Sequence, residues 1–305
     1  MGVARGPHPV SRPASALAGI ALVTVAVACF ATLDTTTKWT SASVPLLMAL
    51  WVRYLFQASV TTAAMLPLRG MALLRTAHPR FQCLRGVLLL TSSLLSFLSL
   101  KHMPVGEFTA IVMITPLVIT LVAALLGDRV SALRWMLVVG GFVGTLIIIR
   151  PGGDTFRWAT LLPLGLVATN AWFQVLTSRL AKTEDPFTMH FYTGWIGTVV
   201  ASIAVPFFWV PIHDWRLWGG MLLMGLMATV GHFLLILAYA RTPAATLTPF
   251  LYGQIGFAML GGWLVFSHVP DQWATLGILL VAVCGAAGAW LTVRESRISV
   301  QPAES

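Results

Sequence analysis

The stretch LSLKHMPVGEFTAIV, residues 98–112, decides the fold because a later stretch repeats its order of features. It ends one apolar run, passes through the charged, proline-containing segment KHMP and opens another apolar run. LAYARTPAATLTPFL, residues 237–251, does the same 139 residues later. Three identities align at this offset: Leu98 with Leu237, Pro104 with Pro243 and Thr109 with Thr248. Self-similarity at a long fixed offset indicates an internal repeat.

The composition around these stretches is that of a polytopic membrane protein. Hydrophobic residues make up 57% of the 305 residues, charged residues only 10%, and the mean hydropathy is +0.84. Soluble domains carry about 25% charged residues. The net charge of +9 is scattered over short segments and forms no basic stripe, so we expect no nucleic-acid partner. The three cysteines have neither disulfide-framework nor metal-site spacing.

The chain contains ten apolar segments that approach the roughly 20 residues needed to cross a bilayer. They cover approximately residues 15–39, 44–67, 82–100, 107–126, 133–150, 158–178, 187–209, 216–238, 244–266 and 273–293. Arg5 and Arg12 precede the first run, and Ala26-Val27-Ala28 could pass for a signal-peptidase site. The run continues past that site, which favours a first transmembrane helix over a cleaved signal peptide.

The distribution of Lys and Arg predicts the orientation. With the N-terminus in the cytoplasm, 13 of the 19 Lys and Arg, Arg85 among them, are assigned to the inner side. Four fall on the outer side, and Lys38 and Arg53 fall within spans. Positive residues accumulate in cytoplasmic loops. We therefore expect both termini in the cytoplasm, in a multi-pass protein of a bacterial inner membrane.

The repeat divides the spans into two groups of five, and five is odd, so the second half must enter the membrane from the opposite side. Loop charges agree, because Arg129 and Arg134 lie between spans four and five while the counterpart segment has neither Lys nor Arg. The predicted fold is all-α, with ten transmembrane helices in two inverted five-helix repeats. The expected divisions are a cytoplasmic arm (1–14), a first repeat (15–151), a second repeat (157–294) and a cytoplasmic tail (295–305). Such repeats recur in secondary transporters.

Longer stretches carry a family resemblance. KHMPVGEFTAIVMITPLVITLVAALLGDRVSALRWMLVVGGFVGTLIIIRPGG (101–153) resembles EamA-type members of the drug/metabolite transporter superfamily. LTSRLAKTEDPFTMHFYTGWIGTVV (176–200) and LAYARTPAATLTPFLYGQIGFAMLGGWLVFSHVPD (237–271) extend the resemblance to roughly residues 15–295. One departure is His268, which stands where the family often has an acid, whereas Asp128 keeps the acid in the first half.

The resemblance implies a basket of ten helices around a central cavity. It also implies that small metabolites cross a bacterial inner membrane through that cavity. Members similar to this chain include exporters of amino acids and carriers of larger metabolites such as riboflavin or S-adenosylmethionine. The resemblance is specific for the family and weak for the substrate.

Two charged residues lie in the first span, within FATLDTTTKWT (30–40). Asp34 and Lys38 are spaced i, i+4 and share one helix face. A lone charge at the bilayer centre costs about 2.5–3.5 kcal/mol, so both side chains should face a cavity or another helix. One explanation is a structural ion pair with Lys38 reaching the outer interface. The other is a polar cavity wall that holds a substrate group or a coupling proton.

Further polar residues within spans are candidates for the cavity. Arg53 lies about mid-span in span two, where it would pair with Asp34 or meet an anionic substrate group. The other candidates are Asn170, Gln174, His232, Tyr252 and Gln254. Interhelical hydrogen bonds, worth about 0.6–2 kcal/mol, are the alternative explanation for each of these five residues. His190 and His232 have no partner at ligand spacing, so we predict no metal site.

Three residues are candidates for gating. Pro116 and Pro249 should kink spans four and nine at related places, either as gate elements or as static bends. Glu107 opens span four at the outer edge, where it is a gating candidate or a cap of the helix N-terminus. Gly140, Gly144, Gly285 and Gly288 allow close helix packing, inside the molecule or in a homodimer.

The absent motifs narrow the function. The sequence has no GxxxxGK[ST] loop, no HExxH and no nucleophile elbow, so we expect neither an enzyme nor a cofactor. The sequence favours a secondary transporter that exports an amino-acid-like or other small polar metabolite by alternating access. The alternative is uptake of a larger metabolite such as riboflavin or S-adenosylmethionine. A membrane-embedded enzyme is the less favoured third class.

Overall fold

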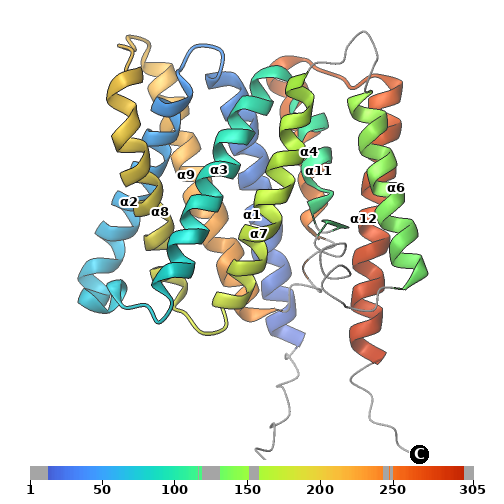
Figure 1. The fold of residues 1–305 in the computed structure, drawn as a ribbon, viewed down its shortest axis with the longest axis horizontal. Helices are drawn as coiled ribbons and strands as arrows, with labels where there is room; N and C mark the ends of the chain where they lie inside the picture. The colour runs from blue at the N-terminus through green and yellow to red at the C-terminus, as the bar shows by residue number, and fades with distance from the viewer. Residues whose placement is uncertain are drawn as a thin grey trace, which may run out of the picture.

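The computed structural model describes residues 13–115, 117–118, 131–150, 158–242, 247 and 250–298. Within these ranges the regular secondary structure is helical (Figure 1). The α-helices are α1 (Pro13–Thr40), α2 (Leu46–Arg69), α3 (Pro79–His102), α4 (Val105–Val112), α6 (Ala132–Ile149), α7 (Leu162–Leu180), α8 (Pro186–Ala204), α9 (Trp215–Arg241), α11 (Gly253–Phe266) and α12 (Gln272–Ile298). Short 3₁₀ segments are η1 (Gly70–Leu74), η2 (Trp158–Leu161) and η3 (Val205–Phe208).

The helices lie where the apolar segments predict them. Each of the ten predicted segments overlaps a described helix, although 107–126 does so only over its first six residues, in α4. Four stretches are long and apolar enough to cross a membrane: Leu17–Thr40, Pro79–His102, Pro186–Phe208 and Trp215–Arg241. A helix of about 24 residues is about 36 Å long, which exceeds the roughly 30 Å hydrocarbon thickness. The architecture is that of an all-helical membrane protein.

Local chemistry sets several helix ends. Pro79 and Pro186 occupy the first turns of α3 and α8, where a missing N–H costs nothing. The Asp185 side chain caps α8 by accepting from the N–H groups of Phe187 and Thr188. α2 stops at Gly70, whose φ of 54° falls in the left-handed region.

The helices form a slab, and the helices at its centre cross one another in the view of Figure 1. α2 packs on α8 at one edge, and α6 packs on α12 at the opposite edge. Between them α1 packs on α9, α3 packs on α7, and α4 packs on α11. The start of α1 and the end of α12 lie at the same end of the slab (Figure 1). We call this the terminal end, and the other the far end.

Small residues bring α6 and α12 together. A methyl group added at Gly140 would meet Cys284 Sγ at 2.7 Å, and one added at Gly144 would meet Val281 Cγ2 at 2.9 Å. A methyl group added at Gly285 would overlap the ring of Tyr252. Packing inside the molecule therefore accounts for three of the predicted small residues. A homodimer stays a prediction.

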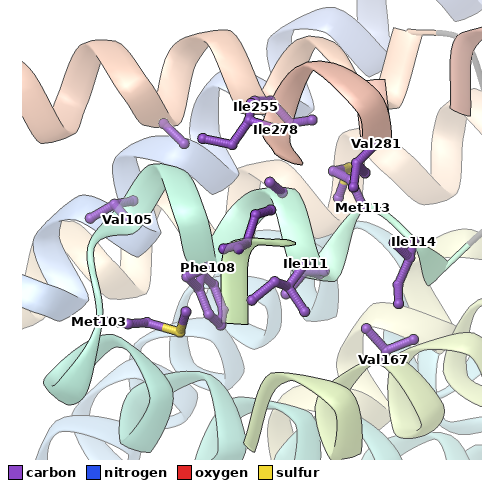
Figure 2. Close-up of a cluster of buried hydrophobic side chains, with 14 of the residues drawn as sticks. Met103, Val105, Phe108, Ile111, Met113, Ile114, Val167, Ile255, Ile278 and Val281 are labelled. Carbon is purple, nitrogen blue, oxygen red and sulfur yellow. The ribbon is translucent and has the colours of Figure 1, made fainter. Parts of the chain in front are cut away.

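The largest buried apolar cluster surrounds α4 (Figure 2). Phe108 and Ile111 of α4 share it with Val167 of α7, Ile255 of α11 and Ile278 of α12. Helices from both halves of the sequence are thus joined by one core, which van der Waals packing holds together within a bilayer.

Both α4 and α11 are interrupted at mid-depth. α4 ends at Val112 and is followed by turns at Met113 and Ile114 before helical residues resume at Thr115. On the other side a turn at Tyr252 precedes the start of α11. The predicted kinks at Pro116 and Pro249 lie outside the described residues, as do Asp128, most of the predicted arm and the end of the tail.

Candidate functional site

A cavity of about 130 Å³ lies in the middle of the molecule. Side chains from α1, α2, α3, α4, α7, α9 and α11 and from the interrupted segments line it. The lining residues are Phe30, Leu33, Asp34, Arg53, Leu89, Ser92, Ser93, Ser96, Phe108, Val112, Met113, Thr115, Leu166, Asn170, Phe173, Gln174, His232, Leu235, Leu251 and Gln254. Apolar walls with a few convergent polar groups are typical of small-molecule sites, but those sites usually measure about 300–1,000 Å³, so a metabolite-sized ligand requires this cavity to widen. Six of the eight predicted cavity residues are among them.

Asp34 is buried in the wall of the cavity. Its Oδ2 accepts a hydrogen bond from Gln254 Nε2 at 3.1 Å, which joins α1 to α11. The predicted ion pair with Lys38 or Arg53 is wrong, because the ion pairs between described residues do not include Asp34. A single neutral donor leaves most of the carboxylate's acceptor capacity for a ligand.

Arg53, on α2, also lines the cavity. Its Nη1 donates to Ser93 Oγ at 2.8 Å, and its guanidinium lies 5.1 Å from the ring centroid of Tyr54. Tyr54 also hydrogen-bonds Ser93, at 2.8 Å. The guanidinium Nε is buried and has no acceptor within the described chain. The cavity therefore holds a carboxyl group and a guanidinium group that make no direct ion pair with each other.

Amide and imidazole groups from α7 and α9 also line the cavity. Asn170 and Gln174 come from α7, and Gln174 Oε1 accepts from the Tyr239 hydroxyl at 3.3 Å. His232 Nδ1 lies 2.8 Å from the Ala228 carbonyl oxygen. Because a carbonyl only accepts, Nδ1 carries a hydrogen, and a neutral ring has an acceptor at Nε2.

Aromatic rings complete the walls. His232 packs edge-on against Phe30 with ring centroids 4.8 Å apart and against Phe173 at 6.1 Å. Phe108 contributes a third phenyl ring, from α4. The cavity can therefore stack a flat group against aromatic faces while amide and hydroxyl groups bind its polar edge.

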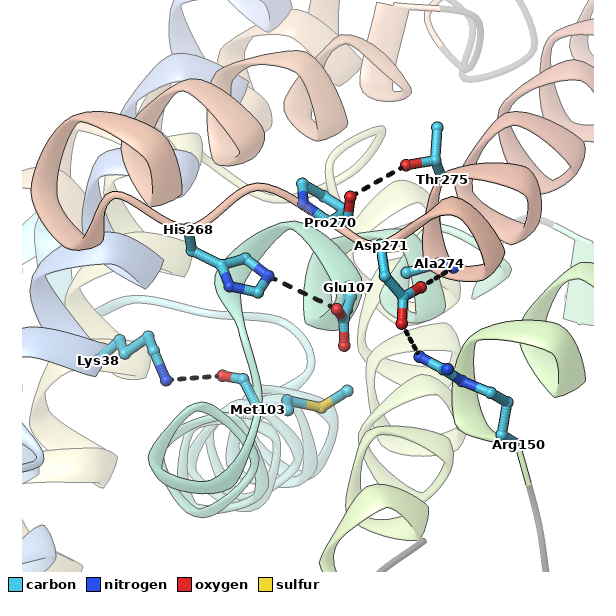
Figure 3. A network of polar contacts seen from close by, with 9 residues as sticks. All are labelled: Lys38, Met103, Glu107, Arg150, His268, Pro270, Asp271, Ala274 and Thr275. Atoms are coloured by element: carbon cyan, nitrogen blue, oxygen red, sulfur yellow. Dashed lines mark hydrogen bonds and ion pairs between the residues drawn. The ribbon is translucent and has the colours of Figure 1, made fainter. Parts of the chain in front are cut away.

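Lys38 and Tyr252 do not line this cavity. Lys38 Nζ donates to the carbonyl oxygens of Leu100 at 3.1 Å and Met103 at 2.9 Å, so it ties α1 to the end of α3 (Figure 3). This contact is structural, but it is not the ion pair that the sequence offered as the structural explanation for Lys38. Tyr252 is buried beside Gly285, and its hydroxyl has no partner within the described chain.

Two ion pairs lie at the far end of the slab (Figure 3). Glu107 Oε1 of α4 lies 3.6 Å from His268 Nε2, which follows α11. Asp271 Oδ2, just before α12, lies 2.6 Å from Arg150 Nη2, just after α6. The Ala274 N–H and then the Arg150 guanidinium hold the pKa of Asp271 below its usual range. Both ion pairs connect the first half of the chain to the second.

Sequence reasoning missed the serines and one arginine. Ser92, Ser93 and Ser96 line the cavity from α3, and the available signal was that Ser92 and Ser93 precede Ser96 by four and three residues in an apolar run. Arg85 lies inside the third predicted span (82–100) but was counted only as an inner-side charge, and the structure buries it fully within α3. Within the described ranges no cluster of three His, Cys, Asp or Glu could hold a metal ion.

Cavity residues of the two halves occupy matching positions. Five pairs separated by 139 residues line it together: Asp34 with Phe173, Ser93 with His232, Ser96 with Leu235, Val112 with Leu251, and Thr115 with Gln254. At a separation of 140 residues, Phe30 pairs with Asn170, Leu33 with Phe173, and Asp34 with Gln174. The offset that aligns the opening stretch thus also aligns one cavity wall with the other.

Comparisons with known proteins identify the family. The chain is 30% identical over 277 residues to a riboflavin transporter of Rhizobium johnstonii, covering 88% of this chain and 90% of that protein. A model of the EamA-like transporter family matches residues 17–150. The chain belongs to the EamA-like transporter family. It is therefore a member of the drug/metabolite transporter superfamily and a membrane protein.

Other similar proteins differ in what their names say they carry. This EamA-like chain is 27% identical over 276 residues to the pseudopaline exporter CntI of Pseudomonas aeruginosa, covering 87% of this chain and 94% of the exporter. It is 23% identical over 227 residues to an S-adenosylmethionine uptake transporter of Rickettsia bellii, covering 74% of this chain and 78% of that transporter. A solved crystal structure with 18% identity has a TM-score of 0.67 and covers 93% of this chain and 99% of that chain, which supports the fold. The named relatives are transporters rather than enzymes.

Proposed function

We propose that this EamA-like protein is a secondary transporter that moves a small metabolite across the bacterial inner membrane by alternating access. The observation that carries the proposal is the central cavity, whose walls come from matching positions of the two halves. In secondary transporters, substrate sites lie near the bilayer midplane at the interface of internal repeats, and interrupted helices often form them. The interruptions after Val112 and at Tyr252 adjoin this cavity.

The proposal includes ten spans in two inverted five-helix repeats. Helix packing supports this, because exchanging the halves maps the contacts onto one another. α1 packs on α9 as α7 packs on α3, and α2 packs on α9 as α8 packs on α3. α2 with α8, α4 with α11 and α6 with α12 pair each span with its own counterpart. Such pairing is expected when a two-fold axis runs through the cavity.

The far end of the slab is proposed as the outer gate. With the terminal end in the cytoplasm, as the Lys and Arg distribution predicts, the pairs Glu107–His268 and Arg150–Asp271 lie on the outer side. Both join opposite halves, so rocking the halves apart on that side must break them. The Lys38 contacts with the α3 carbonyls lie within the first half, so they need not break when the halves separate.

For the substrate we propose a flat heteroaromatic metabolite with a polar side chain, of which riboflavin is the first candidate. Three phenyl rings suit a ring system, and amides and hydroxyls suit its polar edge and a hydroxylated chain. The riboflavin transporter of Rhizobium johnstonii matches most of the chain. These two observations favour the uptake alternative over the amino-acid-like export that the sequence favoured. Export remains the second candidate, since the pseudopaline exporter also matches.

The test uses bacterial cells that neither make nor import riboflavin. Cells producing the wild type are given labelled riboflavin, beside cells producing Asp34→Asn at matched membrane abundance. The matched control is Asp214→Asn, which makes the same substitution at the exposed cap of α9, where Asn also caps. We expect at least about tenfold more intracellular label with wild type and control than with empty cells, and background label with Asp34→Asn.

Other outcomes decide against parts of the proposal. If a compound appears in the medium only with wild type and no flavin enters the cells, the substrate is that exported compound rather than a flavin. Full uptake by Asp34→Asn would remove Asp34 from the substrate site. If the metabolite profiles of medium and cells match those of empty cells, the chain is not a general metabolite transporter.

A further inference from the structure

A second group of buried polar side chains lies beside the cavity, between α3 and α8. Arg85 of α3 is fully buried, and its Nη2 donates to the Met189 carbonyl at 2.6 Å and to Thr193 Oγ1 at 2.5 Å. Its Nε and Nη1 are buried without an acceptor within the described chain. Arg85 does not line the cavity, and the proposed transport mechanism does not use it.

Arg85 carries a charge that the described chain does not neutralise. A guanidinium stays protonated in proteins, and burying an uncompensated charge is costly. The ion pairs of the described residues involve Asp185, Asp271 and Glu107, none of them with Arg85. The Phe173 ring, with its centroid 5.5 Å from the guanidinium carbon, compensates only part of this charge.

Two neighbouring side chains add donors to the same place. Gln82 precedes Arg85 by three residues on the same face of α3, and both its amide nitrogen and its oxygen are buried without a partner in the described chain. The second neighbour is His190 on α8. Gln57 Nε2, from α2, lies 3.3 Å from the His190 carbonyl oxygen and 3.4 Å from His190 Nδ1.

The tautomer of His190 follows from this contact. The carbonyl only accepts, so the Gln57 nitrogen is the donor, and the same nitrogen donates to Nδ1. A neutral imidazole then carries its hydrogen on Nε2, which is buried and has no acceptor in the described chain. Open N–H donors of Arg85, Gln82 and His190 thus lie in one region of α3 and α8.

We propose that Arg85, Gln82 and His190 form a binding site for a small anion, adjacent to the transport cavity and divided from it by Phe173. Phe173 lines the cavity with one part of its surface and packs near the Arg85 guanidinium with another. The anion is either inorganic or the carboxylate of a carried metabolite. Water could satisfy the open oxygens of Gln57 and Gln82 as well, but it does not neutralise the guanidinium.

The site lies toward the terminal end of the molecule. Arg85 follows the start of α3 at Pro79 by about two turns, whereas the cavity residues of that helix run from Leu89 to Ser96. A ligand that leaves the cavity past Phe173 toward the terminal end would therefore meet Arg85. The inference adds a second binding site to the proposed function, and its test does not depend on transport.

The first experiment measures thermal unfolding of the purified full chain in detergent. Chloride or formate replaces the bulky anion of a HEPES salt at constant ionic strength. The wild type is compared with Arg85→Gln and with Arg216→Gln, which removes an exposed arginine over Trp215. We expect Tm to rise by several degrees and saturate for wild type and Arg216→Gln, and to stay constant for Arg85→Gln. No rise in wild type, or an equal rise in Arg85→Gln, would overturn the proposal.

A second variant covers the case in which Arg85→Gln does not fold. Gln82→Leu keeps the guanidinium and removes one donor, so the anion concentration at half-maximal stabilisation should rise about tenfold. An unchanged midpoint would contradict the site. Stabilisation by chloride alone assigns an inorganic anion, whereas stabilisation by formate alone assigns a metabolite carboxylate. Crystals soaked in bromide should then show an anomalous peak beside Arg85 in the first case and none there in the second.

Discussion

Arg53 and Arg85 are both arginines buried inside transmembrane helices, yet their surroundings differ. Arg53 lines the cavity, donates to Ser93 and lies in the wall that also holds Asp34. Arg85 is sealed between α3 and α8 and donates to a carbonyl and a hydroxyl. Neither has an ion-pair partner within the described chain.

The difference suggests separate roles: Arg53 can act on a transported ligand, whereas Arg85 is a buried charge away from the transport cavity. A cation in a cavity is exposed to a ligand and to Asp34, so removing it should change binding more than folding. A sealed cation without a counter-ion weakens the fold until an anion reaches it. The two arginines should therefore respond in opposite ways to the same substitution.

The largest expected effect is on transport by Arg53→Met. A hydrogen bond to a charged group is worth about 1.5–3 kcal/mol, which corresponds to a loss of about 10- to 150-fold in the initial rate. Arg85→Met, with the same change of side chain, should lose much less in chloride-free medium. Initial rates in proteoliposomes at matched protein content test this. Equal losses in the two variants would break the distinction between the arginines.

The next effect is on the free energy of unfolding, where Arg85→Met should have a larger effect than Arg53→Met. In chloride-free buffer, Arg85→Met should raise the free energy of unfolding by about 1 kcal/mol or more, because replacing buried charge by apolar volume is often stabilising. Arg53→Met should change it less. Denaturant titration of both variants and wild type measures this, and added chloride should reduce the gain of Arg85→Met. A large loss of stability in Arg85→Met would mean that its carbonyl and hydroxyl contacts outweigh the buried charge.

The arginines also show what the sequence can predict. Helix positions were predictable because each span must provide about 20 apolar residues, and loops with Pro and charges mark the limits. Arg53 was placed in a span because it lies far from any loop. Arg85 was counted with the inner-side charges, although it lies in the span 82–100, because it closely follows the basic segment that ends at Arg80. Linear distance from a loop does not give burial.

The candidate site was predictable only in part for a similar reason. A rare polar residue in an apolar span must face protein or a cavity, which brought six candidates to one cavity. The rule does not say which of the two a residue faces, so Lys38 and Tyr252 were included although one binds carbonyls and the other packs on α12. The serines escaped because Ser is common in helices, where its hydroxyl can bond to its own backbone, as Ser93 does to Leu89.

A smaller effect is expected at the outer gate, where charges have partners. Glu107→Gln removes the charge that faces His268 at 3.6 Å, and partly exposed pairs contribute about 0.2–1 kcal/mol. The outward-open population should rise by about 1.4- to 5-fold. A single cysteine at Ser96 in a cysteine-free background reports this through its labelling rate from the outside. Lys182→Gln, an exposed charge at the terminal end, is the control. A slower rate in Glu107→Gln would contradict a gate that opens outward when this pair breaks.

The smallest effect is expected for Asp271→Asn, at an exposed ion pair that contrasts with both buried arginines. The Ala274 N–H and the Arg150 guanidinium lower the pKa of Asp271 in the folded state. Its stabilisation should therefore be complete above the unfolded value of about 3.9 and disappear as pH falls through the folded value. Asn keeps the cap on α12, so the comparison isolates the charge.

At pH 7 the free energy of unfolding of the wild type should exceed that of Asp271→Asn by less than about 1 kcal/mol, because solvent screens the pair. Thermal unfolding from pH 7 to pH 3 measures the difference, which should also shrink in 1 M salt, where the screening length is about 3 Å. A difference that persists at pH 3 and in high salt would assign the effect to packing instead, and the exposed pair would then resemble Arg85 more than an ordinary surface contact.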